Sequence, residues 1–129
     1  MLENNPSHDK TPETICLDFI LKEAGDSPEF IVDLLETFLY SLRDHIIVLE
    51  NIHQTGDTEH LYVTVHKLKP SLKMFSLNTS LKQVFTIEEA IHDQLPTIDL
   101  LRIAATLQHT LHLVEEQLLA LIRSYKTTL

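Results

Sequence analysis

Glycine, cysteine and tryptophan are scarce in this chain, which has two, one and none of them among its 129 residues. So few glycines argue against a β-rich architecture, because its many tight turns depend on glycine. The single Cys16 has no partner for an internal disulfide, which favours a reducing compartment and leads us to expect a cytoplasmic protein. No apolar run approaches the roughly 20 residues that span a bilayer, and the N-terminus lacks the basic and apolar regions of a signal peptide. We therefore expect no membrane association.

Basic residues are also in the minority, with ten Lys and Arg against 19 Asp and Glu and a formal net charge of -9. Binding the phosphates of nucleic acids requires a large basic surface, so we do not expect a nucleic-acid partner. The chain has no glycine-rich phosphate loop, and nothing else in it indicates ATP binding. A kinase is therefore disfavoured.

The spacing of apolar residues predicts helices along most of the chain. We expect a flexible leader over residues 1–11 and one helical domain over residues 12–129. The expected helices cover residues 12–24, 28 to about 53 and 58 to about 75, followed by one that starts at Asn78 or Thr79 and one of about 28 residues after Pro96. Short turns between long helices make neighbours antiparallel. The predicted fold is all-α, an up-and-down antiparallel four-helix bundle with a short accessory N-terminal helix.

Capping residues and apolar spacing refine the first three helices. Thr11, Ser27 and Asp57 are expected N-caps, and Gly56 is expected to end the second helix. In the first helix the apolar residues expected to lie over one end of the bundle are Ile15, Leu17, Phe19 and Ile20. In the second helix the expected buried stripe is Phe30, Leu34, Phe38, Leu42, Ile46 and Leu49.

One window of the acidic chain is positively charged. Residues 60 to 87 contain four lysines and no acidic residue, and His66 lies among them. The apolar residues there recur at helical intervals, as Leu61, Val65, Leu68, Leu72 and Phe75. On a wheel of roughly 100° per residue, Tyr62, His66, Lys69, Pro70 and Lys73 lie about 80° to 180° from that seam. We therefore predict that His66 faces solvent with Lys69 and Lys73 one and two turns further on, an arrangement suited to an anion.

The stretch from Val65 through Leu77 resembles the signature helix of histidine-containing phosphotransfer (HPt) domains. That signature reads His, any residue, Leu, Lys, Gly, Ser, then Gly five residues later, and the matching residues here are His66, Leu68, Lys69 and Ser71. Pro70 and Ser76 stand where the family has glycines. Helix order and length extend the resemblance over most of residues 17–125, and residues 25–38 look like the family's second helix. Because Pro70 has no N–H for the carbonyl of His66, we expect the helix to bend or loosen there.

The resemblance implies a protein of a two-component phosphorelay. His66 would accept a phosphoryl group from a receiver-domain aspartate and pass it to another receiver, with Lys69, and less directly Lys73, offsetting the phosphoryl charge. Such a chain is a phosphoryl carrier rather than an ATP-using enzyme, and it needs no cofactor of its own because the magnesium ion belongs to the receiver. The implied partners are response-regulator receivers or a hybrid histidine kinase, and we expect a monomer. The expected contact surface for the receiver consists of Tyr62, Val63, Pro70 and Met74.

Other interpretations stay open at the level of sequence. The same bundle could bind or sequester a receiver, or scaffold a complex, without transferring phosphate, or it could have no signalling role. Glu88 or Gln83 on the fourth helix could bond the ring of His66 if that helix packs alongside. His109 and His112 lie one turn apart, but the sequence places no third ligand beside them, so we expect no metal site.

Overall fold

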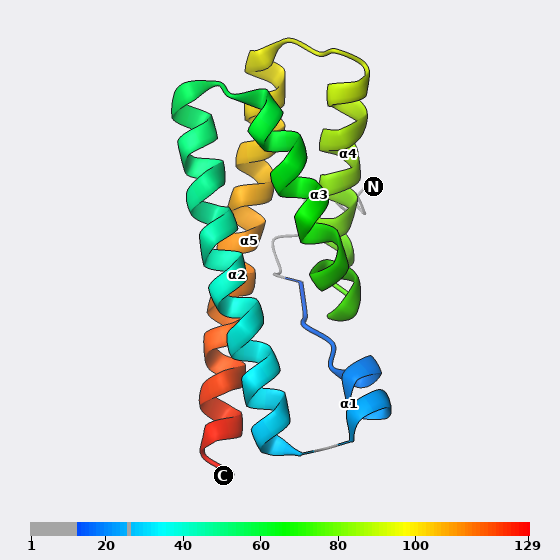
Figure 1. Ribbon diagram of the computed structural model, residues 1–129, viewed down its shortest axis with the longest axis vertical. Helices are drawn as coiled ribbons and strands as arrows, with labels where there is room; N and C mark the ends of the chain where they lie inside the picture. Colours follow the sequence, from blue (N-terminus) through cyan, green and yellow to red (C-terminus); the bar gives the residue numbers. More distant parts are fainter. Residues whose placement is uncertain (1–12, 26) are drawn as a thin grey trace, which may run out of the picture.

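The computed structural model describes residues 13–25 and 27–129, which form five helices and no strand. The helices are α1 (Asp18–Ala24), α2 (Pro28–Thr55), α3 (Thr58–Met74), α4 (Asn78–His92) and α5 (Thr97–Lys126). Figure 1 shows α2 to α5 lying lengthwise beside one another, with successive long helices running in opposite directions. The predicted all-α class is confirmed. The expected leader and the proposed N-cap Thr11 lie outside the described residues.

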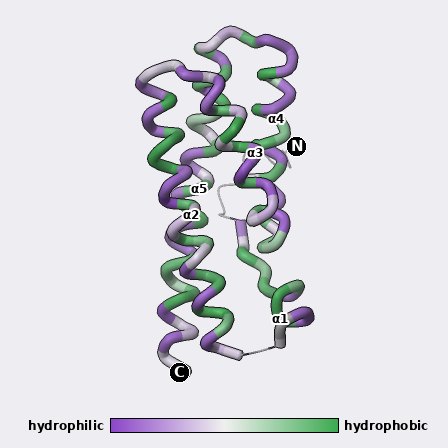
Figure 2. Tube along the Cα trace, in the orientation of Figure 1, coloured by the Kyte–Doolittle hydropathy of each residue, from purple (hydrophilic) through white to green (hydrophobic). Residues whose placement is uncertain are grey.

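Each long helix buries one apolar stripe, and Figure 2 shows the resulting alternation of hydrophobic and hydrophilic residues along the trace. The fully buried large side chains come from α2, α3, α4, α5 and the turn after α3, and include Leu35, Leu42, Leu49, Leu61, Leu68, Leu72, Phe75, Leu77, Ile87, Leu107 and Leu111. In the contact network α2 packs on α3 and α5, while α4 packs on α3 and α5. None of the described helices combines the length and the apolar character needed to cross a bilayer.

The buried stripe of α2 differs from the predicted one at its N-terminal end. Phe30 is 44% exposed, and Ile31 and Leu35 occupy the core in place of Phe30 and Leu34. A strict four-residue spacing drifts by about 40° per step on a helix of 3.6 residues per turn. The stripe therefore mixes steps of three and four residues rather than repeating steps of four. Ser27 caps this helix as predicted, accepting a hydrogen bond from Phe30 N.

The predicted start of the first helix is wrong, because α1 begins at Asp18 and residues 13–17 form no regular secondary structure. We call residues 13–17 the N-terminal strap. Its main-chain groups bond to distant segments instead of to each other: Cys16 N donates to Phe75 O at 3.0 Å, and Ile15 N donates to Gln117 Oε1 at 3.1 Å. Gln117 Nε2 donates in return to the carbonyl oxygen of Glu13. The amides of Ile15 and Cys16 are thus bonded to α5 and to the residue after α3 rather than within a helical turn. Of the apolar residues expected here, Ile15 and Ile20 are buried, while Phe19 is exposed.

The strap also supplies the N-terminal cap of α4. The residue at the N-cap position is Leu77, which has no capping group. The carboxylate of Glu13 accepts from Thr79 N at 2.5 Å and Ser80 N at 2.9 Å, and also from the hydroxyl of Ser80. A carboxylate at this position satisfies free N–H groups and complements the helix dipole. The strap thus fixes the start of the helix that faces α3.

Helices α3 and α4 end in the same way. Ser76 follows α3 with φ of 55°, and Gln94 follows α4 with φ of 58°. After α3, Leu77 N bonds to Leu72 O at 2.8 Å and Ser76 N to Lys73 O at 3.2 Å, the hydrogen-bond pattern of a Schellman motif. This left-handed position is normally a glycine position. Ser76 occupies one of the two signature positions where the HPt pattern has glycine.

Candidate functional site

His66 lies on the outer surface of α3, as the helical wheel predicts. The seam formed by Leu61, Val65, Leu68, Leu72 and Phe75 is buried, each residue being at most 1% exposed. The His66 side chain retains 60% of its surface. Burial of one face of α3 therefore holds the imidazole at a defined place on the opposite face.

Glu88 of α4 lies against one edge of this imidazole. Its Oε2 is 3.5 Å from Nδ1 of His66, and only 16% of the Glu88 side chain is exposed. This distance is longer than a hydrogen bond, and Oε2 of Glu88 is buried without a hydrogen-bond partner among the described residues, so the contact with His66 is electrostatic. When Nδ1 carries the ring proton it faces the carboxylate, and Nε2 is then the unprotonated nitrogen. Of the two α4 candidates for contact with His66, Glu88 is therefore the one in reach, and Gln83 Oε1 is buried without a hydrogen-bond partner in the described part of the chain.

The same carboxylate binds Lys69. Nζ of Lys69 is 3.1 Å from Oε1 and 3.0 Å from Oε2 of Glu88, and the lysine side chain is 20% exposed. Nζ also lies 5.4 Å from the ring centre of Phe85, within the range of a cation–π interaction. Lys69, expected from sequence to be available to an anion, is thus paired with Glu88. From sequence, Glu88 is expected only as one of two possible partners of the His66 ring. Its pairing with Lys69 and the position of Phe85 depend on the packing of α4 against α3, which local spacing does not predict.

An aromatic ring covers the face of the imidazole. Tyr62, one turn before His66, stacks on it with a centroid distance of 5.9 Å and an interplanar angle of 15°. Apolar side chains around the site are also exposed: Tyr62 by 45%, Val63 by 46%, Met74 by 37% and Phe85 by 46%. Pro70 and Lys73 are exposed on the same helix, which is helical through Pro70. The structure thus leaves all four predicted contact residues, Tyr62, Val63, Pro70 and Met74, at the surface.

A second histidine lies half-buried on α2 near α3. His45 Nδ1 is buried and has no hydrogen-bond partner within the described residues. Burial lowers the pKa of His45 from its ordinary value of 6.5, and the positive charge of Lys67 lowers it further, while Asp44 acts in the opposite direction. The surroundings of His45, which include the charge of Lys67, therefore favour the neutral form of its imidazole.

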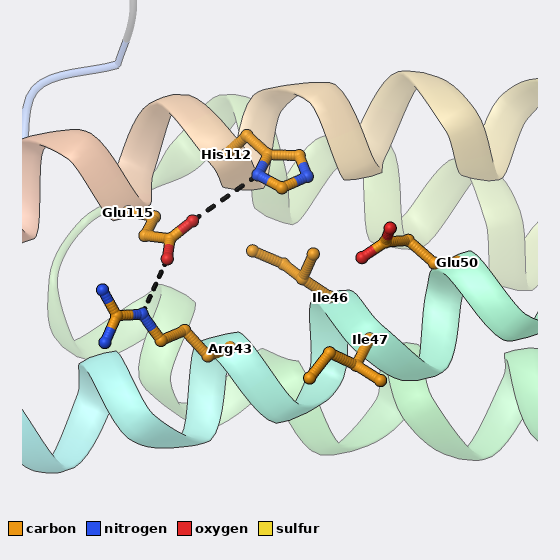
Figure 3. Close-up of a pocket in the computed structure, with 6 residues that line it drawn as sticks. All are labelled: Arg43, Ile46, Ile47, Glu50, His112 and Glu115. Carbon is orange, nitrogen blue, oxygen red and sulfur yellow. Dashed lines mark hydrogen bonds and ion pairs between the residues drawn. The ribbon is translucent and has the colours of Figure 1, made fainter.

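Another imidazole has a carboxylate and a cation beside it, between α2 and α5. Nδ1 of His112 is 3.5 Å from Oε1 of Glu115, whose Oε2 accepts a hydrogen bond of 2.7 Å from Arg43 Nε. Figure 3 shows the imidazole and the guanidinium on either side of that carboxylate, and Ile46 points from α2 into the space between the two helices, while Ile47 also lines this pocket. The carboxylate of Glu50 lines the pocket as well. His112, Glu115 and Arg43 are thus arranged like His66, Glu88 and Lys69, with one carboxylate in contact with both an imidazole and a cation.

At the start of α3, His60 bonds to the capping residue. Nδ1 of His60 lies 2.6 Å from Oδ2 of Asp57, and Asp57 Oδ1 accepts from His60 N. The side-chain hydrogen bond with His60 is the main cause that lowers the pKa of Asp57 below its ordinary 3.8. The predicted cap at Asp57 is confirmed, and His60 is part of that cap. Across residues 13–25 and 27–129, no three His, Cys, Asp or Glu side chains form a group that could hold a metal ion.

Comparison of the chain with family models, with curated proteins and with solved structures gives no significant match. The functional argument therefore rests on the residues and geometry described above.

Proposed function

We propose that this chain is a histidine phosphotransfer protein of the HPt type, folded as an up-and-down antiparallel four-helix bundle with α1 as an accessory helix. The carrying observation is the placement of His66: an exposed imidazole whose Nδ1 faces Glu88, with two lysines further along the same helix face. The opposite directions of successive long helices and their pairwise packing support the bundle.

In the proposed reaction the lone pair of Nε2 attacks the phosphorus of an aspartyl phosphate on a receiver domain. The P–O bond to the aspartate breaks, and the aspartate leaves as a carboxylate. The proton on Nδ1 stays in place and faces Glu88, which stabilises the positive ring that forms. The proposed reaction has no step that consumes ATP. The magnesium ion of such a transfer belongs to the receiver, where it neutralises charge on the phosphoryl oxygens.

The lysines of α3 act on the charge of the transferred group. Lys69 lies one turn beyond His66, and its pairing with Glu88 keeps it close to the imidazole. Lys73 is exposed one turn further on and meets the phosphoryl group or the acidic pocket of the receiver. Phosphoryl transfer depends mainly on positioning and electrostatics, so these charges supply what the reaction requires.

The receiver docks on the apolar surface around His66. Tyr62, Val63 and Met74 are exposed there, together with the low surface of Pro70. Phe85 of α4 adds an aromatic side chain that the sequence argument did not include. Exposed aromatic and methionine side chains are typical of the centre of a protein interface. We propose that the chain works in the cytoplasm as a monomer that carries phosphate between receivers, or from a hybrid kinase to a receiver.

The deciding experiment is incubation with a receiver that has been phosphorylated with labelled phosphate. The wild-type chain should gain label that is stable in base and labile in acid, as phosphohistidine is. His66→Gln should gain none, while its stability changes by less than about 0.5 kcal/mol because the exchange is at the surface. Normal labelling of His66→Gln would overturn the assignment.

The alternative function is a receiver-binding or scaffolding bundle that transfers no phosphate. One observation favours it: both oxygens of Glu88 contact Lys69, so the charge that should assist transfer is already neutralised. This alternative predicts that the labelled receiver binds to the chain while no label becomes covalent. Measuring binding and labelling on the same sample separates the two functions.

A further inference from the structure

The carboxylate of Glu88 lies between a lysine and the imidazole of His66. Its Oε1 accepts a hydrogen bond of 3.1 Å from Nζ of Lys69. Its Oε2 is buried and accepts no hydrogen bond among the described residues, although Nζ of Lys69 lies 3.0 Å away and Nδ1 of His66 lies 3.5 Å away. A buried acceptor without a donor is unfavourable, so this oxygen would gain from a shorter contact with a charged donor.

In the resting protein the charge of Lys69 is occupied by Glu88. The lysine side chain is mostly buried beside this carboxylate, and its Nζ also lies 5.4 Å from the centre of the Phe85 ring. The imidazole of His66 is the exposed member of the group. While that imidazole is neutral, the lysine and the carboxylate neutralise each other. The group formed by His66, Lys69 and Glu88 then offers little charge to an approaching anion.

Phosphorylation of His66 changes this balance of charge. When phosphorus is attached to Nε2, the ring keeps its proton on Nδ1 and carries a positive charge beside Oε2 of Glu88. The phosphoryl group adds more negative charge than one carboxylate has. Lys69 is one turn beyond His66, so its long, flexible side chain reaches a group on the same helix face. Glu88 has a cation beside it throughout, because the charged ring replaces the lysine, and its buried charge is never left unpaired.

We infer that Glu88 exchanges partners when His66 is phosphorylated, passing from Lys69 to the Nδ1–H of the charged ring, and that Lys69 then binds the phosphoryl oxygens. This inference rests on the proposed function of His66. Glu88 is thus a positioning residue that occupies Lys69 at rest and releases it when the phosphoryl group arrives. Free phosphate leaves the ring uncharged and does not start the exchange. The site therefore distinguishes a covalently bound phosphoryl group from a phosphate ion.

Phosphoramidate tests the exchange without a receiver. The lone pair of Nε2 bonds to phosphorus while the P–N bond of the reagent breaks. The amine, which carries three hydrogens in the zwitterionic reagent, leaves as ammonia. The proton on Nδ1 stays, so the product is a positively charged ring bearing the phosphoryl group. The ³¹P NMR signal that is missing from His66→Gln identifies phosphorylated His66 in the full chain.

Glu88→Gln should change two measured quantities in opposite directions. Its affinity for inorganic phosphate, measured by NMR titration, should rise by about two- to fivefold because Lys69 is no longer paired with a carboxylate. Its rate of phosphorylation at His66 by phosphoramidate should fall by about tenfold because the charged ring loses its carboxylate. General electrostatics would raise both quantities, since one negative charge is removed, and a purely structural role would lower both.

Glu89→Gln is the matched control, because it removes the same charge from an exposed neighbouring position on α4. It should leave the phosphate affinity and the phosphorylation rate close to those of the wild type. In Glu88→Gln, a phosphorylation rate that is unchanged or higher would overturn the inference, as would an unchanged phosphate affinity.

A spectroscopic measurement on Lys69 keeps the inference testable even if Glu88→Gln does not fold. The ³¹P signal of phosphorylated His66 should differ between the wild type and Lys69→Met, because the phosphoryl oxygens lose their cation. It should coincide in the wild type and Lys67→Met, since Lys67 is exposed elsewhere on the helix. Identical ³¹P signals in the wild type and Lys69→Met would overturn the inference. The proposed function fails separately, if a phosphorylated receiver leaves wild-type His66 unlabelled.

Discussion

Replacement of Lys69 tests its proposed role in stabilising charge during phosphoryl transfer. Removing its charge should slow phosphoryl transfer by about 100-fold while receiver affinity changes little, because the interaction strengthens as charge develops on the transferring group. Time courses of phosphoryl transfer measure the rate, and a separate binding titration measures the affinity for the receiver. Lys67→Ala is the matched control, since Lys67 is exposed on the same helix about 100° around from His66 and should have a smaller effect.

Lys69→Ala has a second, structural effect that must be separated from the first. Glu88 is 16% exposed and would lose its cation, which should lower the free energy of unfolding by about 1–3 kcal/mol. The double variant Lys69→Met with Glu88→Gln should recover part of that stability and none of the transfer rate. Transfer kinetics unchanged in Lys69→Ala would contradict the assigned role.

His45 predicts how stability depends on pH. Its pKa is lowered in the folded protein by burial and by Lys67, so the unfolded chain binds the proton more readily. The stability linked to His45 is complete above its ordinary pKa of 6.5 and is lost as the pH falls from there toward the folded pKa. Urea unfolding at pH 7.5 and at successive values below 6.5 should show this loss, and His45→Leu should reduce it.

The control for His45 is a histidine that is exposed in the fold. His109 is exposed on α5, and His109→Gln should leave the pH dependence as it is in the wild type. Equal acid sensitivity in His45→Leu and the wild type would show that other groups dominate the titration.

At the scale of elements, the turn after α3 offers a substitution that should stabilise the protein. Ser76 has φ of 55°, a region that costs a non-glycine residue about 1 kcal/mol. Ser76→Gly should therefore raise the free energy of unfolding by up to that amount, measured by urea or thermal unfolding. Ser124→Gly is the matched control, because Ser124 is an exposed residue inside α5, where glycine should destabilise by about 0.5–1 kcal/mol. A loss of stability in Ser76→Gly would contradict the left-handed geometry.

Pro70 tests whether a proline inside α3 serves the site. Proline in a helix interior is about 3 kcal/mol less favourable than alanine, and Pro70 is exposed within α3, so Pro70→Ala should stabilise the protein by up to that amount. Calorimetry measures this change. If transfer stays at the wild-type rate, Pro70 is merely tolerated, and if transfer slows in the more stable variant, Pro70 sets the orientation of His66. Lower stability in Pro70→Ala would exclude both explanations.

At the scale of the whole molecule, the fold was largely predictable from the sequence, and the site was predictable only in part. Apolar periodicity located all four long helices and the solvent-facing position of His66, because each depends on local spacing. The prediction of the α2 stripe was wrong at Phe30, because a fixed four-residue step is only an approximation to helical geometry.

What the sequence could not supply are contacts between segments that lie far apart along the chain. Glu88 reaches His66 and Lys69 only because α3 and α4 pack together. Residues 13–17 lie outside α1, and their bonds to Phe75 and Gln117 depend on the packing of the bundle rather than on local spacing. No pattern within either segment encodes such a pairing.

Within the strap, Glu13 stabilises a distant helix, because its side chain caps α4. Glu13→Ala removes the carboxylate that caps α4 and should destabilise the protein by about 1–2 kcal/mol, as the loss of other helix caps does. Chemical denaturation of this variant measures the effect, and the exposed neighbour Thr14 supplies the control Thr14→Ala. If Glu13→Ala and Thr14→Ala both unfold at the same denaturant concentration as the wild type, the capping role of Glu13 is wrong.

The strap also has a consequence for the order in which the protein folds. Its bonds join residues 59 to 104 positions apart, and the two that involve Gln117 close the longest loops among the hydrogen bonds described here. Such contacts cannot form before α4 and α5 are in place, because both hold acceptors or donors for the strap. Docking of the strap is therefore a late folding event, and its release is an early step of unfolding that leaves the long helices intact. The main-chain amides of Thr79 and Ser80 then exchange hydrogen with water whenever the strap is undocked, on a timescale separate from that of the core.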